Sequence, residues 1–171
     1  DFAVPRHDFS WCVPISTQCL HAAGAALAFK LRGEDRIAVS TCGDGGSSKT
    51  DFYAALNSGG AYELPLVLCV INNGWAISVP RSAQTLAQKG IAGGTFCLQV
   101  DGNDLIAVLE AMRIATERAR SGQGTSVLEF VTYRLGDHTT GDGARRYRDV
   151  ADVKSAWERD PVTRLRTWLT A

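Results

Sequence analysis

The stretch that decides the fold is PLVLCVI, residues 65–71, which runs directly into NNG at 72–74. A run as continuously apolar as this one is typical of a parallel β-strand that other elements cover on both faces. Asn-Gly is a turn signal, so we expect the strand to end there. Similar apolar runs at 36–42, 95–100 and 126–133 predict three further strands.

Helices are expected between these strands. Residues 17–31 are rich in alanine and leucine and contain no proline, and a second helix should begin within 49–51. In residues 105–120 the apolar side chains recur at helical spacing. Residues 150–171 predict two short C-terminal helices, because Pro161 interrupts the pattern. The alternation of strands and helices predicts an α/β fold, with a parallel sheet that has helices on both faces.

The size and composition favour a single domain that spans residues 1–171. The chain has 45% hydrophobic and 21% charged residues, the balance of a folded domain and not of a disordered segment. Lys plus Arg and Asp plus Glu number 18 each, so no overall positive charge is available to bind nucleic acid or an anionic membrane. No apolar run approaches the roughly 20 residues that a membrane-spanning helix needs.

The five cysteines are scattered and include no C-x-x-C pair, which argues against a disulfide framework or a zinc site. A reducing, cytoplasmic location is therefore expected. The first residues show no basic-then-apolar targeting pattern. Asp1 does not resemble a natural start, so the sequence reads as a piece of a longer chain.

The ends of the predicted strands carry the residues that suggest chemistry. A Gly-Asp-Gly turn at 43–45 frees backbone N–H groups to approach an anion, and its Asp44 carboxylate can take a divalent metal. This tripeptide is also common in plain turns, so it does not decide alone. The 26 residues between Gly45 and Asn72 suffice for a helix and a return strand, which would bring Asn73 beside Asp44. Mg²⁺ takes about six oxygens, and a diphosphate with a carboxylate, an amide and a main-chain carbonyl supplies most of them.

Several segments resemble known families. Gly-Asp-Gly, followed by 26 residues and Asn-Asn, resembles the signature of thiamine-diphosphate enzymes. The segments that resemble the alpha subunit of two-chain 2-oxoacid dehydrogenases are GDGGSSKTDFY (43–53), NNGWAISVPR (72–81), VDGND (100–104) and YRLGDHTT (133–140). The resemblance runs over essentially the whole chain. It implies the thiamine diphosphate-binding fold, in a domain of the diphosphate-binding type, and it places the N-terminal part of the family chain before Asp1.

The resemblance also implies a set of ligands. Mg²⁺ would be held by the Asp44 carboxylate, the Asn73 side-chain oxygen and the main-chain carbonyl of Trp75. Gly45 and Gly46 would offer backbone N–H groups to the diphosphate. The charged end of the cofactor would thus be bound where the first two strands end.

Two isoleucines are candidates for contact with the cofactor rings. In the family an aliphatic side chain props the cofactor in its bent conformation, and Ile15 resembles that residue. Ile77 would line the thiazolium side. Ordinary core packing explains both side chains equally well and stays open. Asn72 is expected to stabilise the turn rather than to bind metal.

A potassium site is a further implication of the resemblance. Thr17 and Gln18, together with the main-chain oxygens of Cys12 and Pro14, stand where some relatives hold K⁺. Thr17 is equally explained as the cap of the first helix, so both interpretations stay open.

His138 is the candidate catalytic residue. It lies in the segment 134–148, which resembles the family's active-site loop, and the matching histidine reaches the diphosphate and the reaction intermediate. Imidazole titrates near neutrality, so it can hydrogen-bond an anion and assist proton movement during acyl transfer. His7 and His21 have no motif around them and are expected to be ordinary histidines.

The same loop carries charge and a hydroxyl. Thr139 stands where mitochondrial relatives carry a regulated serine, and a phosphate there would repel the cofactor's diphosphate. Arg145, Arg146 and Arg148 form a basic cluster, which is more often a solvated face than a site. In the family this loop faces the lipoyl-bearing partner.

The resemblance implies oxidative decarboxylation of a 2-oxoacid and transfer of the acyl unit to a lipoyl disulfide. The run QTLAQKG (84–90) is most similar to bacterial pyruvate dehydrogenase (acetyl-transferring) alpha subunits, with branched-chain 2-oxoacid and acetoin dehydrogenases as alternatives. The implied partners are a beta subunit, in an α2β2 assembly, and the lipoyl-bearing acyltransferase. The beta subunit would supply the glutamate that activates the aminopyrimidine. The glutamates of this chain lie in ordinary helix, strand or loop contexts: Glu34, Glu63, Glu110, Glu117, Glu129 and Glu158.

Two other classes of protein remain as alternatives. A non-catalytic domain that binds Mg²⁺ and a nucleotide phosphate is disfavoured by the absence of a G-x-x-x-x-G-K-[ST] loop and of a strand-linked G-x-G-x-x-G. A pure assembly subunit would make Asp44 and Asn73 dispensable.

Overall fold

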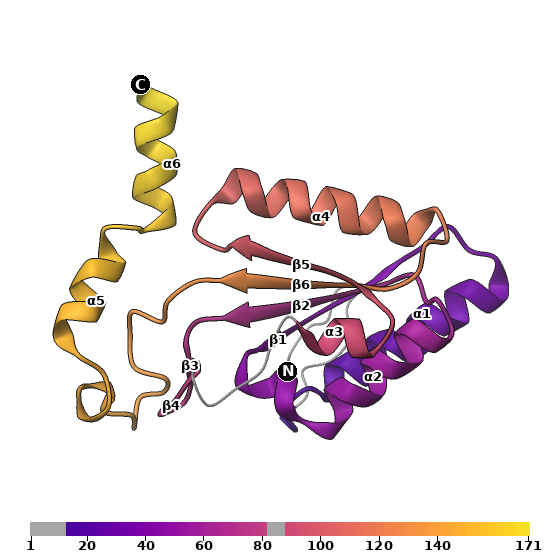
Figure 1. Cartoon of the computed structure of the whole chain (residues 1–171), viewed down its shortest axis with the longest axis horizontal. Coiled ribbons are helices and arrows are strands. Elements are labelled where there is room, and N and C mark those ends of the chain that lie inside the picture. The colour runs from indigo at the N-terminus through magenta and orange to yellow at the C-terminus, as the bar shows by residue number, and fades with distance from the viewer. Residues whose placement is uncertain (1–12, 82–87) are drawn as a thin grey trace, which may run out of the picture.

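Four parallel strands form the sheet of this chain, whose computed structural model describes residues 13–81 and 88–171. The spatial order is β1 (Ala38–Gly43), β2 (Leu66–Asn72), β6 (Ser126–Val131) and β5 (Phe96–Asp101). The predicted strands and their parallel pairing are confirmed. Because β2 and β6 occupy the centre, their residues are almost all buried, as continuous apolar runs require. The order also brings the carboxyl ends of β1, β2 and β6 side by side (Figure 1).

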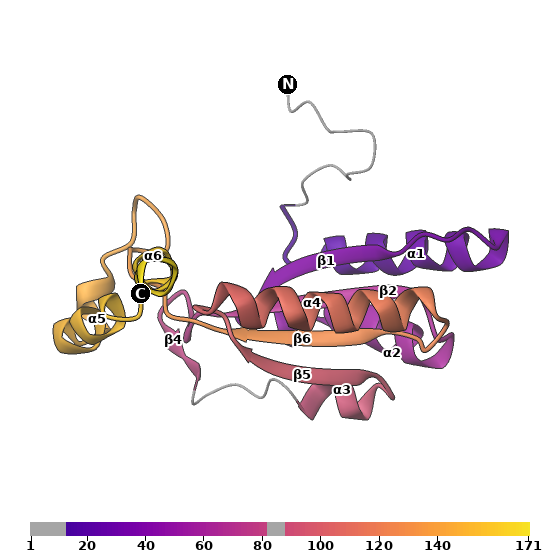
Figure 2. The same cartoon turned by 90° about the horizontal axis from the view of Figure 1, so that it is seen from above.

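Helices cover both faces of the sheet, as predicted. On one face α1 (Thr17–Arg32) and α2 (Thr50–Ala61) share a core with β1 and with alternate residues of β2. On the other face α4 (Leu105–Arg120) packs Ala111 and Ala115 against β2 and β6. Figures 1 and 2 show α4 on one side of the sheet and α1 and α2 on the other.

The sequence did not predict several short elements. They are the 3-10 turn η1 (Gly45–Ser48), the antiparallel pair β3 (Trp75–Ala76) and β4 (Val79–Pro80), helix α3 (Gln88–Ala92) and the 3-10 turn η3 (Ala144–Arg146). Such elements have too few residues to show an apolar period, so only the structure reveals them. Three of them, η1 and the β3–β4 hairpin, lie directly after the ends of β1 and β2.

The C-terminal region forms α5 (Val150–Trp157) and α6 (Pro161–Thr170), which confirms the two predicted helices. Both lie beyond the carboxyl edge of the sheet (Figures 1 and 2). None of the residues of α6 is buried. Arg164 ties this helix to the end of β5 and the start of α4, through ion pairs of 2.6 Å to Asp101 and 2.8 Å to Asp104.

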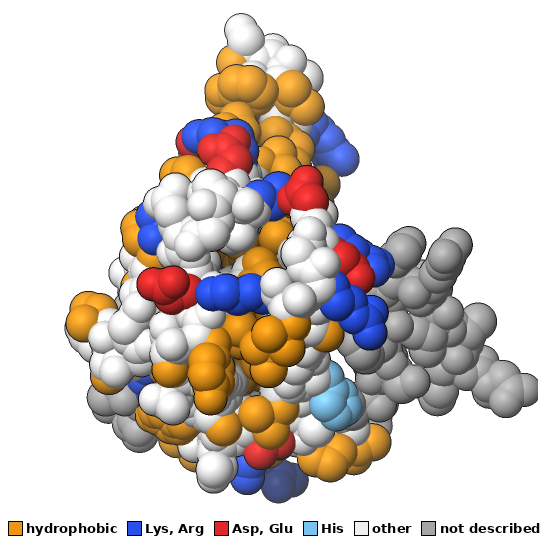
Figure 3. All heavy atoms as spheres, turned by 90° about the vertical axis from the view of Figure 1, so that its right-hand side faces the viewer, with side chains coloured by type: hydrophobic (Ala, Val, Ile, Leu, Met, Phe, Trp, Pro, Cys, Tyr) orange, Lys and Arg blue, Asp and Glu red, His pale blue; other side chains and the backbone are white. Residues whose placement is uncertain are grey.

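The surface agrees with the balanced charge of the sequence. On the face in Figure 3, basic and acidic side chains are interspersed with apolar ones, and no extended patch of one sign forms. Within the described ranges no helix is both long and apolar enough to cross a membrane. Cys19, Cys42, Cys69 and Cys97 are free thiols, while Cys12 lies outside the described residues.

Candidate functional site

Asp44 and Asn73 follow the ends of neighbouring strands, as the sequence predicted. The backbone N–H of Asp44 donates to the carbonyl of Ile71 (3.2 Å), which extends the pairing of β1 with β2 by one residue. Asn73 follows directly on β2. Asp44 is only 1% exposed, an unusual state for a carboxylate and one that needs compensating partners. Asp44 and Asn73 therefore lie at the same edge of the sheet, and the acid among them is buried.

The turn after Asp44 is built from the two glycines that the resemblance singled out. Gly45 and Gly46 open η1, and the first backbone N–H groups of a helical turn have no partner within the turn itself. Ser16 is fully buried and donates from Oγ to the carbonyl of Gly46 (2.8 Å). A Cβ on Gly46 would lie 3.3 Å from Cγ2 of Ile15. The structure thus brings Ile15 next to the turn, although 30 residues separate Ser16 from Gly46.

The β3–β4 hairpin packs directly on this turn. A Cβ on Gly45 would lie 2.5 Å from Cβ of Ala76, which is closer than real Cβ atoms approach. Glycine at position 45 therefore allows the hairpin to lie against η1 and keeps Asp44 beside the segment that carries Asn73 and Trp75.

For the ligand set that the resemblance implies, replacing Gly45 by alanine is expected to weaken binding of Mg²⁺ and thiamine diphosphate about tenfold or more. The added methyl would push Ala76 away, and overpacking of this kind costs about 1–3 kcal/mol. Titration calorimetry with Mg²⁺ and cofactor measures the effect. The double variant Gly45→Ala/Ala76→Gly removes the clash and should recover most of the affinity. A double variant as weak as the single one would show that this contact does not organise the site.

Side chains of the β2 end shape the turn into the hairpin. The Oδ1 of Asn72 accepts the N–H of Gly74 (3.2 Å), and the Oδ1 of Asn73 accepts the N–H of Trp75 (3.2 Å). Gly74 has a φ of 87°, a conformation that glycine adopts at little cost. Asn72 is therefore a turn-stabilising residue, as expected.

Ile15 and Ile77 do not belong to the core. They are 59% and 54% exposed, so ordinary core packing is the wrong interpretation of both. Ile77 also has a φ of 57°, in the left-handed region that a β-branched residue rarely adopts. Such strain persists only where the surroundings enforce it, and it is found most often at functional sites.

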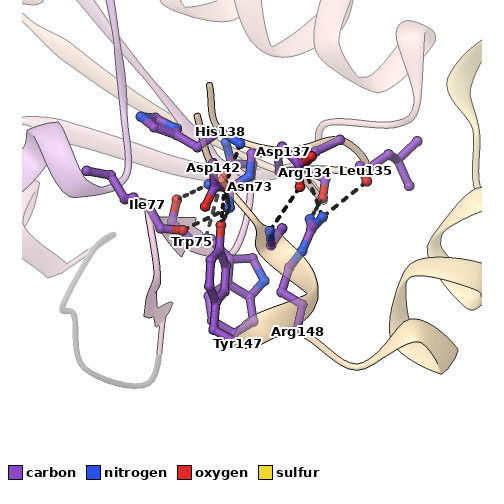
Figure 4. Close-up of polar contacts among 12 residues, drawn as sticks. Asn73, Trp75, Ile77, Arg134, Leu135, Asp137, His138, Asp142, Tyr147 and Arg148 are labelled. Atoms are coloured by element: carbon purple, nitrogen blue, oxygen red, sulfur yellow. Dashed lines mark hydrogen bonds and ion pairs between the residues drawn. The ribbon is translucent and has the colours of Figure 1, made fainter. Parts of the chain in front are cut away.

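Arg134, which the sequence did not single out, binds the loop after β6 to the hairpin. Its guanidinium donates to the carbonyls of Ile77 (2.8 Å) and Trp75 (3.4 Å), and to the hydroxyl of Tyr147 (2.6 Å). The ring centroids of Trp75 and Tyr147 lie 5.3 Å apart. Figure 4 shows these residues converging from the hairpin and from the two ends of the loop. The strained backbone at Ile77 is held by this arginine.

Arg148 closes the loop 134–148 from its other end. It donates to the carbonyls of Arg134, Leu135 (3.2 Å) and Gly136 (3.0 Å) and is 9% exposed, so its assignment to a solvated basic face was wrong. Arginine can satisfy several carbonyls with one planar group, and a short sequence cluster does not reveal this use. Arg145 and Arg146 are exposed, in agreement with the prediction.

His138 is held by its backbone and exposed through its side chain. Its N–H donates to Oδ2 of Asp142 (2.8 Å), which also accepts the hydroxyl of Tyr147. The hydrogen bond from Tyr147 is the main cause that lowers the pKa of Asp142, so this carboxylate stays ionised. In Figure 4 the side chain of His138 points away from this polar cluster. The loop therefore fixes the position of His138 and leaves its imidazole accessible.

Lys89 is a further residue that the sequence did not reveal. Its ammonium group is buried under η1 and donates to the carbonyl of Ser47 (3.0 Å), to its Oγ (3.0 Å) and to Oγ of Ser48 (3.2 Å). Burial lowers the pKa of Lys89, while the nearby charge of Asp44 acts in the opposite direction. A buried cation thus supports the turn and offsets part of the charge of Asp44. Residues 84–87 of the same sequence motif lie outside the described residues.

The structure describes three of the four residues that were expected to bind potassium: Pro14, Thr17 and Gln18. Thr17 is not the helix cap, because Ser16 occupies that position and the hydroxyl of Thr17 donates to Asp51 (2.7 Å). A hydroxyl that donates in this way keeps its lone pairs for a cation. The side-chain nitrogen of Gln18 donates to the carbonyl of Thr41 (2.9 Å), whereas its buried Oε1 has no hydrogen-bond partner among residues 13–81 and 88–171. A buried oxygen of this kind is compatible with a cation ligand; Cys12 lies outside the described residues.

Comparisons of the sequence with known proteins agree on one family. The model of the family described as dehydrogenase E1 component matches residues 9–171. The pyruvate dehydrogenase E1 component subunit alpha of Staphylococcus aureus (strain Mu50) is 46% identical over 161 residues, which are 91% of this chain and 43% of that one. The 3-methyl-2-oxobutanoate dehydrogenase subunit alpha of Mycobacterium tuberculosis (strain H37Rv) is also 46% identical over 161 residues, 92% of this chain and 44% of that one. The chain thus spans less than half the length of these curated relatives.

Two solved structures share the fold. An enzyme from Mycobacterium smegmatis, assigned as thiamin diphosphate-dependent, has a TM-score of 0.52 and 25% identity over 66% of this chain and 21% of its own. Benzoylformate decarboxylase from Polynucleobacter necessarius has a TM-score of 0.52 and 20% identity over 66% of this chain and 22% of its own. Since the family model covers nearly all of the sequence and the relatives align over 91–92% of it, this chain belongs to the dehydrogenase E1 component family.

Proposed function

We propose that this chain is the magnesium- and thiamine diphosphate-binding part of the alpha subunit of a pyruvate dehydrogenase (acetyl-transferring). The observation that carries the proposal is the placement of Asp44 and Asn73 after adjacent strands, with a glycine turn and a hairpin packed on each other. The family membership and the alpha-subunit relatives support it. The product would be an acetyl group on a lipoyl carrier.

In this proposal the charged end of the cofactor is bound by one edge of the sheet. Asp44, the side-chain oxygen of Asn73 and the carbonyl of Trp75 hold Mg²⁺, and the N–H groups of Gly45 and Gly46 bind the diphosphate. The carbonyl of Trp75 already accepts a long bond from Arg134, and its second lone pair remains for the metal. The donor set of one carboxylate, one amide and one carbonyl fits a hard cation that shares a diphosphate.

The other residues of the site position the reacting end. The bound cofactor supplies the electron sink for decarboxylation. Ile15 and Ile77 present exposed aliphatic side chains beside the turn and the hairpin, where they would support the rings in the bent conformation. Thr17, Gln18 and the carbonyl of Pro14 would hold K⁺ and so fix the segment that carries Ile15.

The proposed partners are a beta subunit, in an α2β2 assembly, and a lipoyl-bearing acyltransferase. The beta subunit supplies the glutamate that activates the aminopyrimidine. In support of this, both carboxylate oxygens of Glu129, which lies near this edge, are engaged by donors of the same chain. The exposed face of the loop 134–148 would meet the lipoyl group.

A branched-chain 2-oxoacid dehydrogenase is the second candidate, because the relative that acts on 3-methyl-2-oxobutanoate is as similar as the pyruvate enzyme. The test is turnover of pyruvate, 3-methyl-2-oxobutanoate and acetoin by the full-length alpha chain with the beta subunit encoded beside it. We expect pyruvate to give the highest kcat/KM. Preference for the branched substrate or for acetoin would reassign the substrate, and turnover of none of the three would refute the proposed function.

Replacing His138 by alanine is expected to lower acetyl transfer to the lipoyl partner by about 100-fold or more, the scale of a lost general acid or base. Cofactor affinity should fall much less, because the imidazole is exposed. The loop itself is held by the backbone N–H of His138 and by the guanidinium of Arg148, and the substitution leaves both in place. Single-turnover kinetics of acetyl transfer and calorimetry of cofactor binding separate the two effects. A variant that reacts with lipoylated partner at the wild-type rate would remove His138 from the mechanism.

A further inference from the structure

Glu129 is not an ordinary strand residue, which corrects the expectation from the sequence. It lies on the central strand β6 and is 1% exposed. Its neighbours Leu128 and Phe130 face α4, so Glu129 points to the opposite face, where it meets Asn72 at the end of β2. An ionisable group buried at this depth requires partners, because a buried charge without them is costly.

Three side chains direct donors at this carboxylate. Asn72 donates from Nδ2 to Oε1 (2.6 Å), and Gln99 donates from Nε2 to Oε2 (3.1 Å). The guanidinium of Arg81 approaches Oε1 to 3.5 Å. The partners come from β2, from β5 and from the residue that follows β4. Every contact requires an acceptor, which an ionised carboxylate provides on both oxygens.

Two of these partners hold the two ends of the hairpin. Asn72, fixed by Glu129, uses its own Oδ1 to accept the N–H of Gly74 (3.2 Å). Arg81 donates its backbone N–H to the carbonyl of Gly74 (3.0 Å), and this bond closes the hairpin. One buried carboxylate is therefore linked to both ends of the segment that carries Trp75.

We propose that Glu129 is a positioning residue for the metal site, which acts by holding the segment 72–81 in its ligand-bearing conformation. This inference rests on the proposed function, since it takes Asn73 and Trp75 as metal ligands. Glu129 is not among the proposed ligands of the metal or the cofactor. It fixes the turn at Asn72, and the turn sets the direction of the two ligand oxygens.

The charge of Glu129, and not only its volume, is what the arrangement requires. In Glu129→Gln the side chain keeps its size but has one acceptor oxygen, and its NH₂ group must face a donor. Gln99 is exposed and can turn its own amide to accept from this NH₂ group, so the hydrogen bond from Asn72 can be kept and the change falls on the ion pair. Arg81, which is half-exposed, loses the charge that draws it inward. The hairpin is expected to loosen while the sheet stays intact.

The experiment compares Glu129→Gln with Glu110→Gln in the full-length alpha chain assembled with its beta subunit. Glu110 is a matched control, because it undergoes the same change on the exposed face of α4, where it pairs with Arg113. The first readout is the Mg²⁺ concentration that half-saturates thiamine diphosphate binding. We expect an increase of about 10- to 100-fold for Glu129→Gln, the usual effect of losing a group that orients a metal ligand, and none for Glu110→Gln. The second readout is hydrogen exchange, measured without metal or cofactor. In Glu129→Gln the amides of Gly74 and Arg81 should exchange faster than in the wild type, while the exchange of the α4 amides should not change.

The two readouts separate this inference from the proposed function. If the wild-type enzyme shows no Mg²⁺-dependent cofactor binding, the proposed function fails, and unchanged exchange in Glu129→Gln would overturn the positioning role as well. A lower melting temperature with an unchanged Mg²⁺ requirement would make Glu129 merely structural and overturn the inference. If Glu129→Gln does not fold, Arg81→Met removes one partner at the surface. It should raise the Mg²⁺ requirement about tenfold, and an unchanged requirement would overturn the inference.

Discussion

Replacing Asp44 by alanine is expected to abolish Mg²⁺-dependent binding of thiamine diphosphate by the assembled enzyme and to leave the fold intact. Asp44 would be the one carboxylate in the proposed ligand set. Loss of a group that only orients a ligand costs about 10- to 100-fold in metal affinity, so loss of the ligand itself should cost more than about 100-fold. Asn73→Ala should weaken binding in the same direction. Calorimetry with Mg²⁺ and cofactor measures both effects.

The fold should survive because the turn is held through the backbone of Asp44. Its N–H donates to Ile71, and its carbonyl accepts the N–H (3.1 Å) and the Oγ (2.7 Å) of Ser47. Alanine keeps all three bonds. Asp152→Ala, on the exposed surface of α5, is the control for loss of a carboxylate. Unchanged cofactor binding by Asp44→Ala would remove the metal-site assignment and favour the alternative of a pure assembly subunit.

The second large effect is expected from the absence of a partner: the 171-residue chain without a beta subunit should turn over no pyruvate. Ile15 and Ile77 expose more than half of their side chains at the site, so the cofactor rings would lie on an open surface. Glu129 is enclosed by its donors and is not presented to a pyrimidine. A site that binds only the charged end of the cofactor cannot hold the reacting end in a near-attack geometry.

Decarboxylation of pyruvate with a dye acceptor, measured with and without the beta subunit, tests this dependence. Activity should appear only in the mixture of the full-length alpha chain with beta. Appreciable turnover by the alpha chain alone would mean that one of its own acids activates the pyrimidine, and the proposed division of labour between subunits would be wrong.

The sequence predicted the strands and helices that are specified by short stretches of neighbouring residues. The run 65–71 predicted a strand covered on both faces, and its end at Asn72 followed from the Asn-Gly turn. The edge that holds Asp44 and Asn73 was also predictable, because neighbouring parallel strands end on the same side of a sheet. These predictions depend on short patterns and on a general rule of topology.

The features that escaped prediction depend on contacts between distant segments. Lys89 reaches Ser47 across 42 residues, and Glu129 reaches Asn72 across 57. In the sequence, a lysine in a polar run and a glutamate in a strand look like surface residues. Arg148 was misjudged for the same reason, because its neighbours Arg145 and Arg146 are exposed. Burial of a charged side chain is set by tertiary structure, which no local pattern records.

The left-handed backbone at Ile77 has a consequence for how this molecule can evolve or be engineered. A non-glycine residue in a sparsely populated conformation costs about 1–3 kcal/mol, which the rest of the fold must offset. Selection for heat resistance alone would therefore favour glycine or asparagine at position 77, since either relaxes the backbone. Such a chain would gain stability and lose the aliphatic side chain that the hairpin presents at the proposed site. At position 77 a thermostability screen should therefore select glycine or asparagine, whereas an activity screen should retain isoleucine.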